Sequence, residues 1–88
     1  MRVDLYTKPS CGYCVSTKAL LNQKNIPFTE YTIGDQVSKE DVQKRITDMG
    51  LSVQVRTVPQ IFYIDKNNIT TYIGGYSDLV SKQAILGS

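Results

Sequence analysis

The sequence contains no histidine. A chain without histidine has neither a Ser–His nor a Cys–His nucleophile pair, and it has no imidazole to offer a metal ion. Cysteine is scarce as well, because Cys11 and Cys14 are the only two in the chain. Any thiol chemistry in this protein must therefore activate a cysteine without a neighbouring imidazole.

Two further absences limit the classes of partner. The ten Lys and Arg residues are scattered and the net charge is only +2, so no basic run tracks a phosphate backbone and nucleic-acid binding is not predicted. The apolar runs are all short, which excludes a membrane span. The chain leads into a strand pattern without a signal or transit segment, so we expect a cytoplasmic protein. Its 88 residues suffice for one core, and we predict a single domain over residues 1–88.

The local patterns predict secondary structure in the order β-α-β-α-β-β-α. The predicted strands are Val3–Thr7, Phe28–Ile33, Pro59–Ile64 and Ile69–Ile73; the predicted helices are Cys11–Asn25, a segment between Ser38 and Gly50, and Ser77–Leu86, with Ser77 or Tyr76 near the last cap. A β-α-β unit is parallel with a right-handed crossover, whereas strands joined by a short turn are antiparallel. The sequence therefore predicts an α/β fold with a four-stranded mixed sheet and helices on its faces.

The second predicted helix has the clearest local signals. Ser38 as N-cap and Asp41 three residues later approximate a capping box, with Asp in place of the usual Glu. Val37 and Val42 can form the accompanying hydrophobic staple. Gly50 is a natural residue to follow the end of a helix. These signals predict both ends of the helix from local sequence.

The two cysteines form the motif Cys11-Gly12-Tyr13-Cys14 at the predicted start of the first helix. Unpaired backbone N–H groups and the positive end of the helix dipole favour a thiolate there. A structural disulfide would close a loop too short to constrain the unfolded chain much, and a closed zinc site would lack half of its ligands unless two copies shared it. A C-x-x-C motif near a β-α-β pattern is more typical of thioredoxin-like redox chemistry, which is the interpretation we prefer.

The two thiols of such a pair have different roles. One thiolate attacks a disulfide, and the other resolves the mixed disulfide that forms. Cys11 is closest to the helix N-terminus and follows Lys8, whose ammonium can stabilise a thiolate, so we predict that Cys11 is the nucleophile. Cys14 lies one turn further into the helix. We expect it to be more buried and to be the resolving thiol.

Two later segments can complete a ligand site, and each also has a simpler interpretation. In Thr57-Val58-Pro59, a strand can begin at the proline; alternatively, a cis Val58–Pro59 bond turns the Val58 backbone toward the thiolate, where an extended peptide can pair with it. The sequence leaves these two open. Gly74-Gly75-Tyr76-Ser77-Asp78 is by itself a strand-to-helix turn. As a ligand site, its glycines permit close approach, the helix start suits a carboxylate, and Asp78 suits an ammonium.

These segments, taken in order, resemble those of a glutaredoxin, and the resemblance extends over nearly the whole chain. It implies a thioredoxin fold and a glutathione-dependent oxidoreductase that reduces protein disulfides and glutathione mixed disulfides, with Cys11 attacking and Cys14 resolving. Transferred by position, the implied glutathione contacts are Lys8 and Tyr13 beside the cysteines, Thr57, Val58 and Pro59 along the cysteinyl backbone, and Gly75, Tyr76, Ser77 and Asp78 at the γ-glutamyl end. The resemblance further implies a monomer, with ribonucleotide reductase as a family-level partner. The tryptophan that thioredoxins carry beside the pair is absent.

The chain departs from the usual glutaredoxin pattern in two places. Gly12 replaces a proline, and members with glycine or serine there are associated with a [2Fe–2S] cluster held between two subunits by one cysteine and one glutathione thiolate from each. A cluster-binding dimer, with Cys11 as the ligand, is therefore the alternative function. The stretch Leu51–Arg56 is longer than in many relatives and resembles compact bacterial and phage forms. It leaves Lys44 and Gln43 as the candidates for contacting the glycyl carboxylate of glutathione.

Overall fold

Four strands form one mixed sheet in the computed structural model, which describes residues 1–82. The strands are β1 (Arg2–Thr7), β2 (Phe28–Thr32), β3 (Gln60–Ile64) and β4 (Thr70–Gly74), and their order across the sheet is β2-β1-β3-β4. β1 pairs in parallel with β2 and antiparallel with β3, and β3 pairs antiparallel with β4. The predicted mixed sheet is therefore confirmed.

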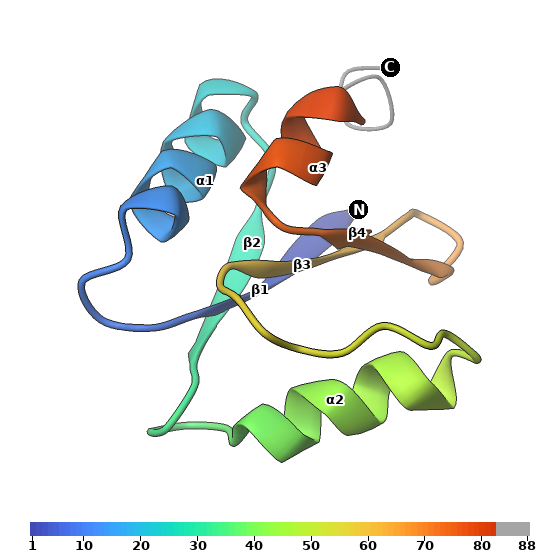
Figure 1. The fold of residues 1–88 in the computed structure, drawn as a ribbon. Coiled ribbons are helices and arrows are strands. Elements are labelled where there is room, and N and C mark those ends of the chain that lie inside the picture. Colours follow the sequence, from blue (N-terminus) through green and yellow to red (C-terminus); the bar gives the residue numbers. More distant parts are fainter. Residues whose placement is uncertain (83–88) are drawn as a thin grey trace.

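Three helices cover the two faces of this sheet (Figure 1). α1 (Gly12–Gln23) and α3 (Tyr76–Ser81) lie together on one face, and α2 (Lys39–Asp48) lies alone on the other. A buried apolar cluster fills each side. On the α1 and α3 side it comprises Val3, Leu5, Leu21, Ile26, Ile61, Ile73 and Leu79; on the α2 side it comprises Tyr6, Ile33, Val42, Ile46, Val55 and Phe62. This arrangement is a thioredoxin fold, as predicted.

The ends of several elements differ from the prediction by one or two residues. α1 ends at Gln23 rather than Asn25, because Asn25 has a left-handed φ of 56° that cannot continue the helix. β2 ends at Thr32, and Ile33 instead forms an isolated bridge with Val37. β3 begins after the proline, and β4 is shifted by one residue to end at Gly74. Within residues 1–82, no helix is long and apolar enough to cross a membrane.

The capping box of α2 is confirmed. The Ser38 hydroxyl accepts a hydrogen bond from the Asp41 N–H at 3.0 Å, and the Asp41 carboxylate accepts one from the Ser38 N–H at 2.8 Å. The Ser38 N–H, aided by the Ser38 hydroxyl, holds the pKa of Asp41 below its ordinary value. Gly50 follows the helix with a φ of 81°, as expected for a terminating glycine.

The start of α3 differs from the prediction. Its N-cap is Gly75, not Ser77 or Tyr76, and the Gly75 N–H donates to Asp78 Oδ2 at 3.0 Å. The helix begins earlier than expected because the carboxylate three residues on satisfies this N–H. The predicted continuation to Leu86 falls on residues 83–88, which lie outside the described residues.

Arg45 joins α2 to the sheet. Its Nη1 donates to Asp4 Oδ2 and to the Tyr6 hydroxyl oxygen, both at 2.9 Å, and its guanidinium carbon lies 4.4 Å from the centre of the Phe62 ring. Asp4 is buried, with 4% of its surface exposed. The shorter of the two ion pairs of Asp4 is therefore made by a residue from a different element, at 2.9 Å from Arg45 against 3.3 Å from Arg2.

Candidate active site

The two cysteines are paired as a disulfide at the N-terminus of α1. Cys11 is the N-cap, with extended backbone, and the N–H of Cys14 donates to Cys11 Sγ at 3.1 Å. Cys14 is 2% exposed, whereas Cys11 is half-buried. An incoming sulfur therefore has access to Cys11, and the backbone donor already faces the atom on which a thiolate charge would sit.

Val58 approaches the disulfide from the loop that precedes β3. Its carbonyl oxygen lies 3.8 Å from Cys11 Sγ, although the two residues are 47 positions apart in the sequence. The Val58–Pro59 peptide bond is cis, and β3 begins immediately afterwards at Gln60. The cis bond of the second interpretation is thus confirmed, whereas the strand begins one residue after the proline rather than at it.

A groove of about 410 Å³ runs from this point to the start of α3. It is lined by every residue of the implied glutathione site except Lys8, namely Tyr13, Thr57, Val58, Pro59, Gly75, Tyr76, Ser77 and Asp78. The rings of Tyr13 and Tyr76 stack with their centres 5.9 Å apart. Tyr13 remains 66% exposed, so this stack forms an open rim to the groove rather than part of the core.

Four further residues line the same groove, and sequence reasoning did not identify them: Val53, Gln54, Gln60 and Tyr72. Two of these form a polar chain, in which the Tyr72 hydroxyl donates to Gln60 Oε1 at 2.5 Å and Gln60 Nε2 donates to the Thr57 carbonyl at 2.8 Å. Burial, together with the negative charge of Asp78, raises the pKa of Tyr72. Tyr72 therefore stays protonated and keeps its role as donor. No local signal marks Gln60, because a glutamine in a strand is usually on the exposed face.

Lys8 lies in a separate, smaller pocket beside Val58. This pocket has a volume of about 90 Å³, and its cationic lining residues are Lys8, Lys39 and Arg56. Lys39 and Arg56 come from α2 and from the loop after it, and were not predicted as site residues. Only the tertiary fold brings these cations together, since the three are far apart in sequence.

The two helix residues considered for the glycyl carboxylate are engaged elsewhere. Gln43 hydrogen-bonds the backbone of Val53 and Val55, at 2.8 and 2.9 Å. Lys44 pairs with Asp48 at 2.8 Å, and this hydrogen bond raises the pKa of Lys44. Neither residue lines the groove or the cationic pocket.

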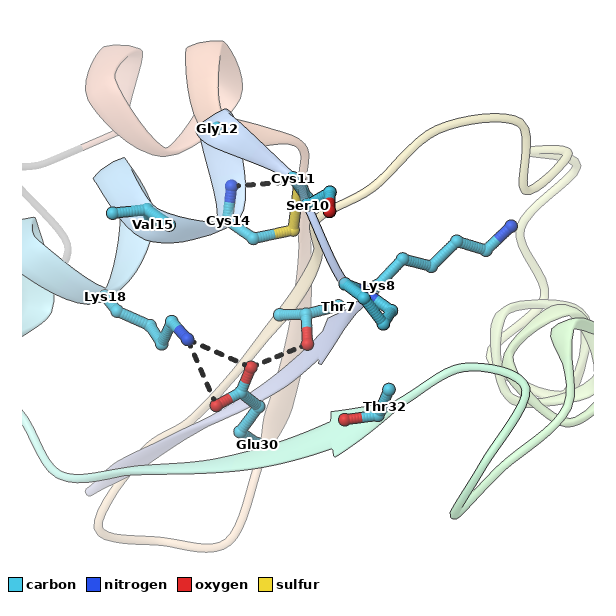
Figure 2. Close-up of a pocket in the computed structure, with 11 residues that line it drawn as sticks. Thr7, Lys8, Ser10, Cys11, Gly12, Cys14, Val15, Lys18, Glu30 and Thr32 are labelled. Carbon is cyan, nitrogen blue, oxygen red and sulfur yellow. Dashed lines mark hydrogen bonds and ion pairs between the residues drawn. A yellow bond between two sulfur atoms is a disulfide. The ribbon is translucent and has the colours of Figure 1, made fainter.

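A third cavity, of about 440 Å³, lies beside both cysteines and is bounded by α1, β1 and β2 (Figure 2). Glu30 lies on its wall, where it accepts hydrogen bonds from the Thr7 hydroxyl at 2.7 Å and from Lys18 Nζ at 3.2 and 3.3 Å. The hydrogen bond from Thr7, aided by Lys18, holds the pKa of Glu30 below its ordinary value. Lys8 extends away from this group in Figure 2. Glu30 was not predicted as a site residue, because nothing local distinguishes it from an exposed strand glutamate.

Within the described residues, no group of three or more His, Cys, Asp or Glu side chains is arranged to hold a metal ion. The zinc interpretation of the cysteine pair therefore gains no further ligand from within residues 1–82. The site thus combines the partly exposed Cys11 and the buried Cys14 with a groove whose wall carries both backbone and side-chain polar groups. This combination suits thiol–disulfide exchange with an extended, peptide-like partner.

Comparison with known proteins agrees with this chemistry. A family model described as Glutaredoxin matches residues 3–69. Glutaredoxin 3 of Escherichia coli (strain K12) is 41% identical over 83 residues, which cover 93% of this chain and 86% of the relative. Glutaredoxin 1 of Rickettsia prowazekii (strain Madrid E) is 39% identical over 77 residues, covering 88% and 72%. The crystal structure of glutaredoxin 1 from Francisella tularensis complexed with cacodylate superposes with a TM-score of 0.72 at 28% identity, and covers 99% of this chain and 98% of that one.

Proposed function

The chain belongs to the glutaredoxin family of thiol–disulfide oxidoreductases, and on that basis we propose that it uses glutathione as the reductant, with Cys11 as nucleophile and Cys14 as resolving thiol. The observation that carries the proposal is the groove lined by Val58, whose carbonyl oxygen lies 3.8 Å from Cys11 Sγ, and by Asp78. Its length offers separate positions for the thiol, the peptide backbone and the charged end of a tripeptide. Both cysteines and the groove come from one chain, so the proposed reaction needs only a monomer.

Reduction of a substrate disulfide begins at Cys11. The Cys11 thiolate attacks one sulfur of the substrate, forms a mixed disulfide, and expels the other substrate sulfur as a thiolate that takes a proton from solvent. Cys14 then loses its proton and attacks Cys11 Sγ. This forms the Cys11–Cys14 disulfide and releases the second substrate thiolate. The substrate has gained two electrons from the two cysteines, and its two thiolates take up two protons, one that Cys14 released and one from solvent.

Two glutathione molecules return the enzyme to its reduced form. The first glutathione thiolate attacks Cys11 Sγ, the accessible sulfur, and Cys14 leaves as a thiolate that is then protonated. The second attacks the sulfur of the bound glutathione, releases oxidised glutathione, and leaves Cys11 as a thiolate. The N–H of Cys14 at 3.1 Å stabilises that charge.

The groove suggests how glutathione is held. The cysteinyl backbone would pair with Val58 as an added strand, because the Val58 carbonyl lies 3.8 Å from Cys11 Sγ. The γ-glutamyl ammonium would meet Asp78, whose Oδ1 has no hydrogen-bond partner among residues 1–82. The glycyl carboxylate would meet the cations of the small pocket, Lys8, Lys39 and Arg56.

The test is a glutathione-coupled disulfide reduction assay on the wild type, Cys11→Ser and Cys14→Ser. We expect Cys11→Ser to lose all activity, because the one remaining thiol, Cys14, is buried. We expect Cys14→Ser to keep the reduction of glutathione mixed disulfides and to lose most reduction of protein disulfides, because it lacks only the resolving thiol. Full activity of Cys11→Ser would refute the assignment of roles.

A second candidate function is a [2Fe–2S] cluster bound between two copies of the chain, and Gly12 is the observation that favours it. A Cβ added at Gly12 would meet nothing within 4 Å, so the backbone next to Cys11 faces open space that a second copy could approach. The ligands would be Cys11 of each copy and two glutathione thiolates, since Cys14 is buried. Anaerobic reconstitution with iron, sulfide and glutathione tests this candidate: a coloured dimer on a sizing column supports it, and a colourless monomer refutes it.

A further inference from the structure

Gln43 forms a contact that the proposed reaction does not use. Its Nε2 donates to the Val53 carbonyl at 2.8 Å, and its Oε1 accepts from the Val55 N–H at 2.9 Å. These are the two backbone groups, flanking Gln54, that a residue of a neighbouring parallel strand would engage. The side-chain amide of Gln43 therefore makes the two hydrogen bonds that a backbone peptide group of a neighbouring strand would make.

The loop that Gln43 engages has little else to hold its backbone. Among residues 1–82, no backbone–backbone hydrogen bond joins residues 52–58 to the rest of the chain. Val55 inserts into the α2-side cluster and is 4% exposed, which fixes one point of the loop. In Figure 1 the segment between α2 and β3 runs back alongside α2, the helix that carries Gln43.

This loop supplies one wall of the groove and part of the cationic pocket. Val53 and Gln54 line the groove, and Arg56 lines the pocket. Arg56 Nη2 also donates to Gln54 Oε1 at 2.7 Å, which links the side chain in the pocket to one in the groove. A displacement of the loop would alter both the groove and the pocket while leaving the cysteines in place.

We propose that Gln43 is a positioning residue, which sets the affinity for glutathione by holding residues 52–56 in place as the wall of its groove. The proposal rests on the proposed glutathione-dependent function. Only a side chain with a donor and an acceptor on one planar group, at this length, can bond both Val53 and Val55. Gln43 itself does not line the groove, so it acts through the loop.

The test compares Gln43→Met and Gln43→Glu with the wild type, with Glu40→Met as the control on an exposed position of the same helix. Methionine keeps the length and the helix propensity but forms neither hydrogen bond. Glutamate keeps the acceptor for the Val55 N–H and loses the donor to the Val53 carbonyl. We expect the apparent KM for glutathione to rise about fivefold in Gln43→Met, the equivalent of about one ordinary hydrogen bond, and to be unchanged in Glu40→Met.

Two readouts separate positioning from loss of fold. The rate at which iodoacetamide alkylates Cys11 is expected to be the same in all variants, because Gln43 does not touch the cysteines. Amide exchange of the Val55 N–H, followed by NMR, is expected to accelerate about tenfold in Gln43→Met and to stay slow in Gln43→Glu. A Gln43→Met variant with accelerated Val55 exchange and an unchanged KM would overturn the role of Gln43. A wild type whose disulfide glutathione does not reduce would instead overturn the proposed function.

Discussion

Asp78 has two roles that a pair of substitutions can separate. Its Oδ2 caps α3 by accepting from the Gly75 N–H at 3.0 Å, and its charge faces the groove where we place the γ-glutamyl ammonium. Asp78→Asn keeps an acceptor for the cap and removes the charge. Asp78→Ala removes both.

The structure gives the magnitude of each effect. Gly75 is only partly buried, so water can replace the lost cap in Asp78→Ala, and the cost to the free energy of unfolding is about 1 kcal/mol. For a domain of this size that cost lowers Tm by about 5 °C. The Asp78 side chain is exposed, so its ion pair with an ammonium is worth about 0.7 kcal/mol, or roughly a threefold rise in KM for glutathione.

We therefore expect Asp78→Asn to raise KM about threefold without changing Tm, and Asp78→Ala to raise KM at least as much while lowering Tm by about 5 °C. Steady-state kinetics at varied glutathione and a thermal melt measure the two quantities. Because the ion pair is exposed, the difference in KM between Asp78→Asn and the wild type should shrink at high salt. An Asp78→Asn variant with an unchanged KM at low salt would refute the placement of the ammonium.

Two further predictions concern the folded state. Arg45→Met leaves the buried Asp4 carboxylate paired only with the exposed Arg2, 3.3 Å away. We expect urea denaturation at pH 7 to show that the free energy of unfolding falls by about 3 kcal/mol, and that adding Asp4→Asn partly restores it. A fall no larger than that caused by replacing an exposed arginine would contradict the ion-pair explanation. Glu30 has a pKa lowered from 4.5, by Thr7 first and Lys18 second, so its stabilisation is present above pH 4.5 and is lost as the pH falls through the folded-state pKa. Since the Glu30 side chain is 34% exposed, that contribution is below about 1 kcal/mol. The free energy of unfolding of Glu30→Gln should therefore fall less steeply with decreasing pH than that of the wild type. The same pH dependence in both proteins would contradict this explanation.

The order of the elements could be predicted because its signals are local. The capping box at Ser38 and Asp41 and the glycine at Gly50 involve residues within one or two turns of each other, and both ends of α2 followed from them. The start of α3 was placed wrongly because its cap depends on which way the Asp78 carboxylate turns. Backbone propensity around Ser77 does not specify that direction.

The candidate site could be predicted only in part. Residues that share a segment with the cysteines or with Pro59 were found, because the segments themselves carry recognisable motifs. Lys39, Arg56 and Glu30 were missed, since each is an ordinary charged residue in its own segment and reaches the site only when α2, the following loop and β2 pack around the sheet. The contacts of Gln43 with Val53 and Val55 could not be predicted, because these partners are ten and twelve residues away along an irregular loop.

The sequence by itself determined that two thiols stand one helical turn apart at the N-terminus of a helix, in a chain with no imidazole to assist them. Redox chemistry followed from that spacing, because a helix start stabilises a thiolate through groups within the same turn. The tertiary structure alone decided what surrounds the reactive sulfur: the cis Val58–Pro59 bond, the Val58 carbonyl 3.8 Å from Cys11, and the loop held by Gln43. These depend on contacts between distant segments, which only the packing of helices on the sheet brings within hydrogen-bonding distance.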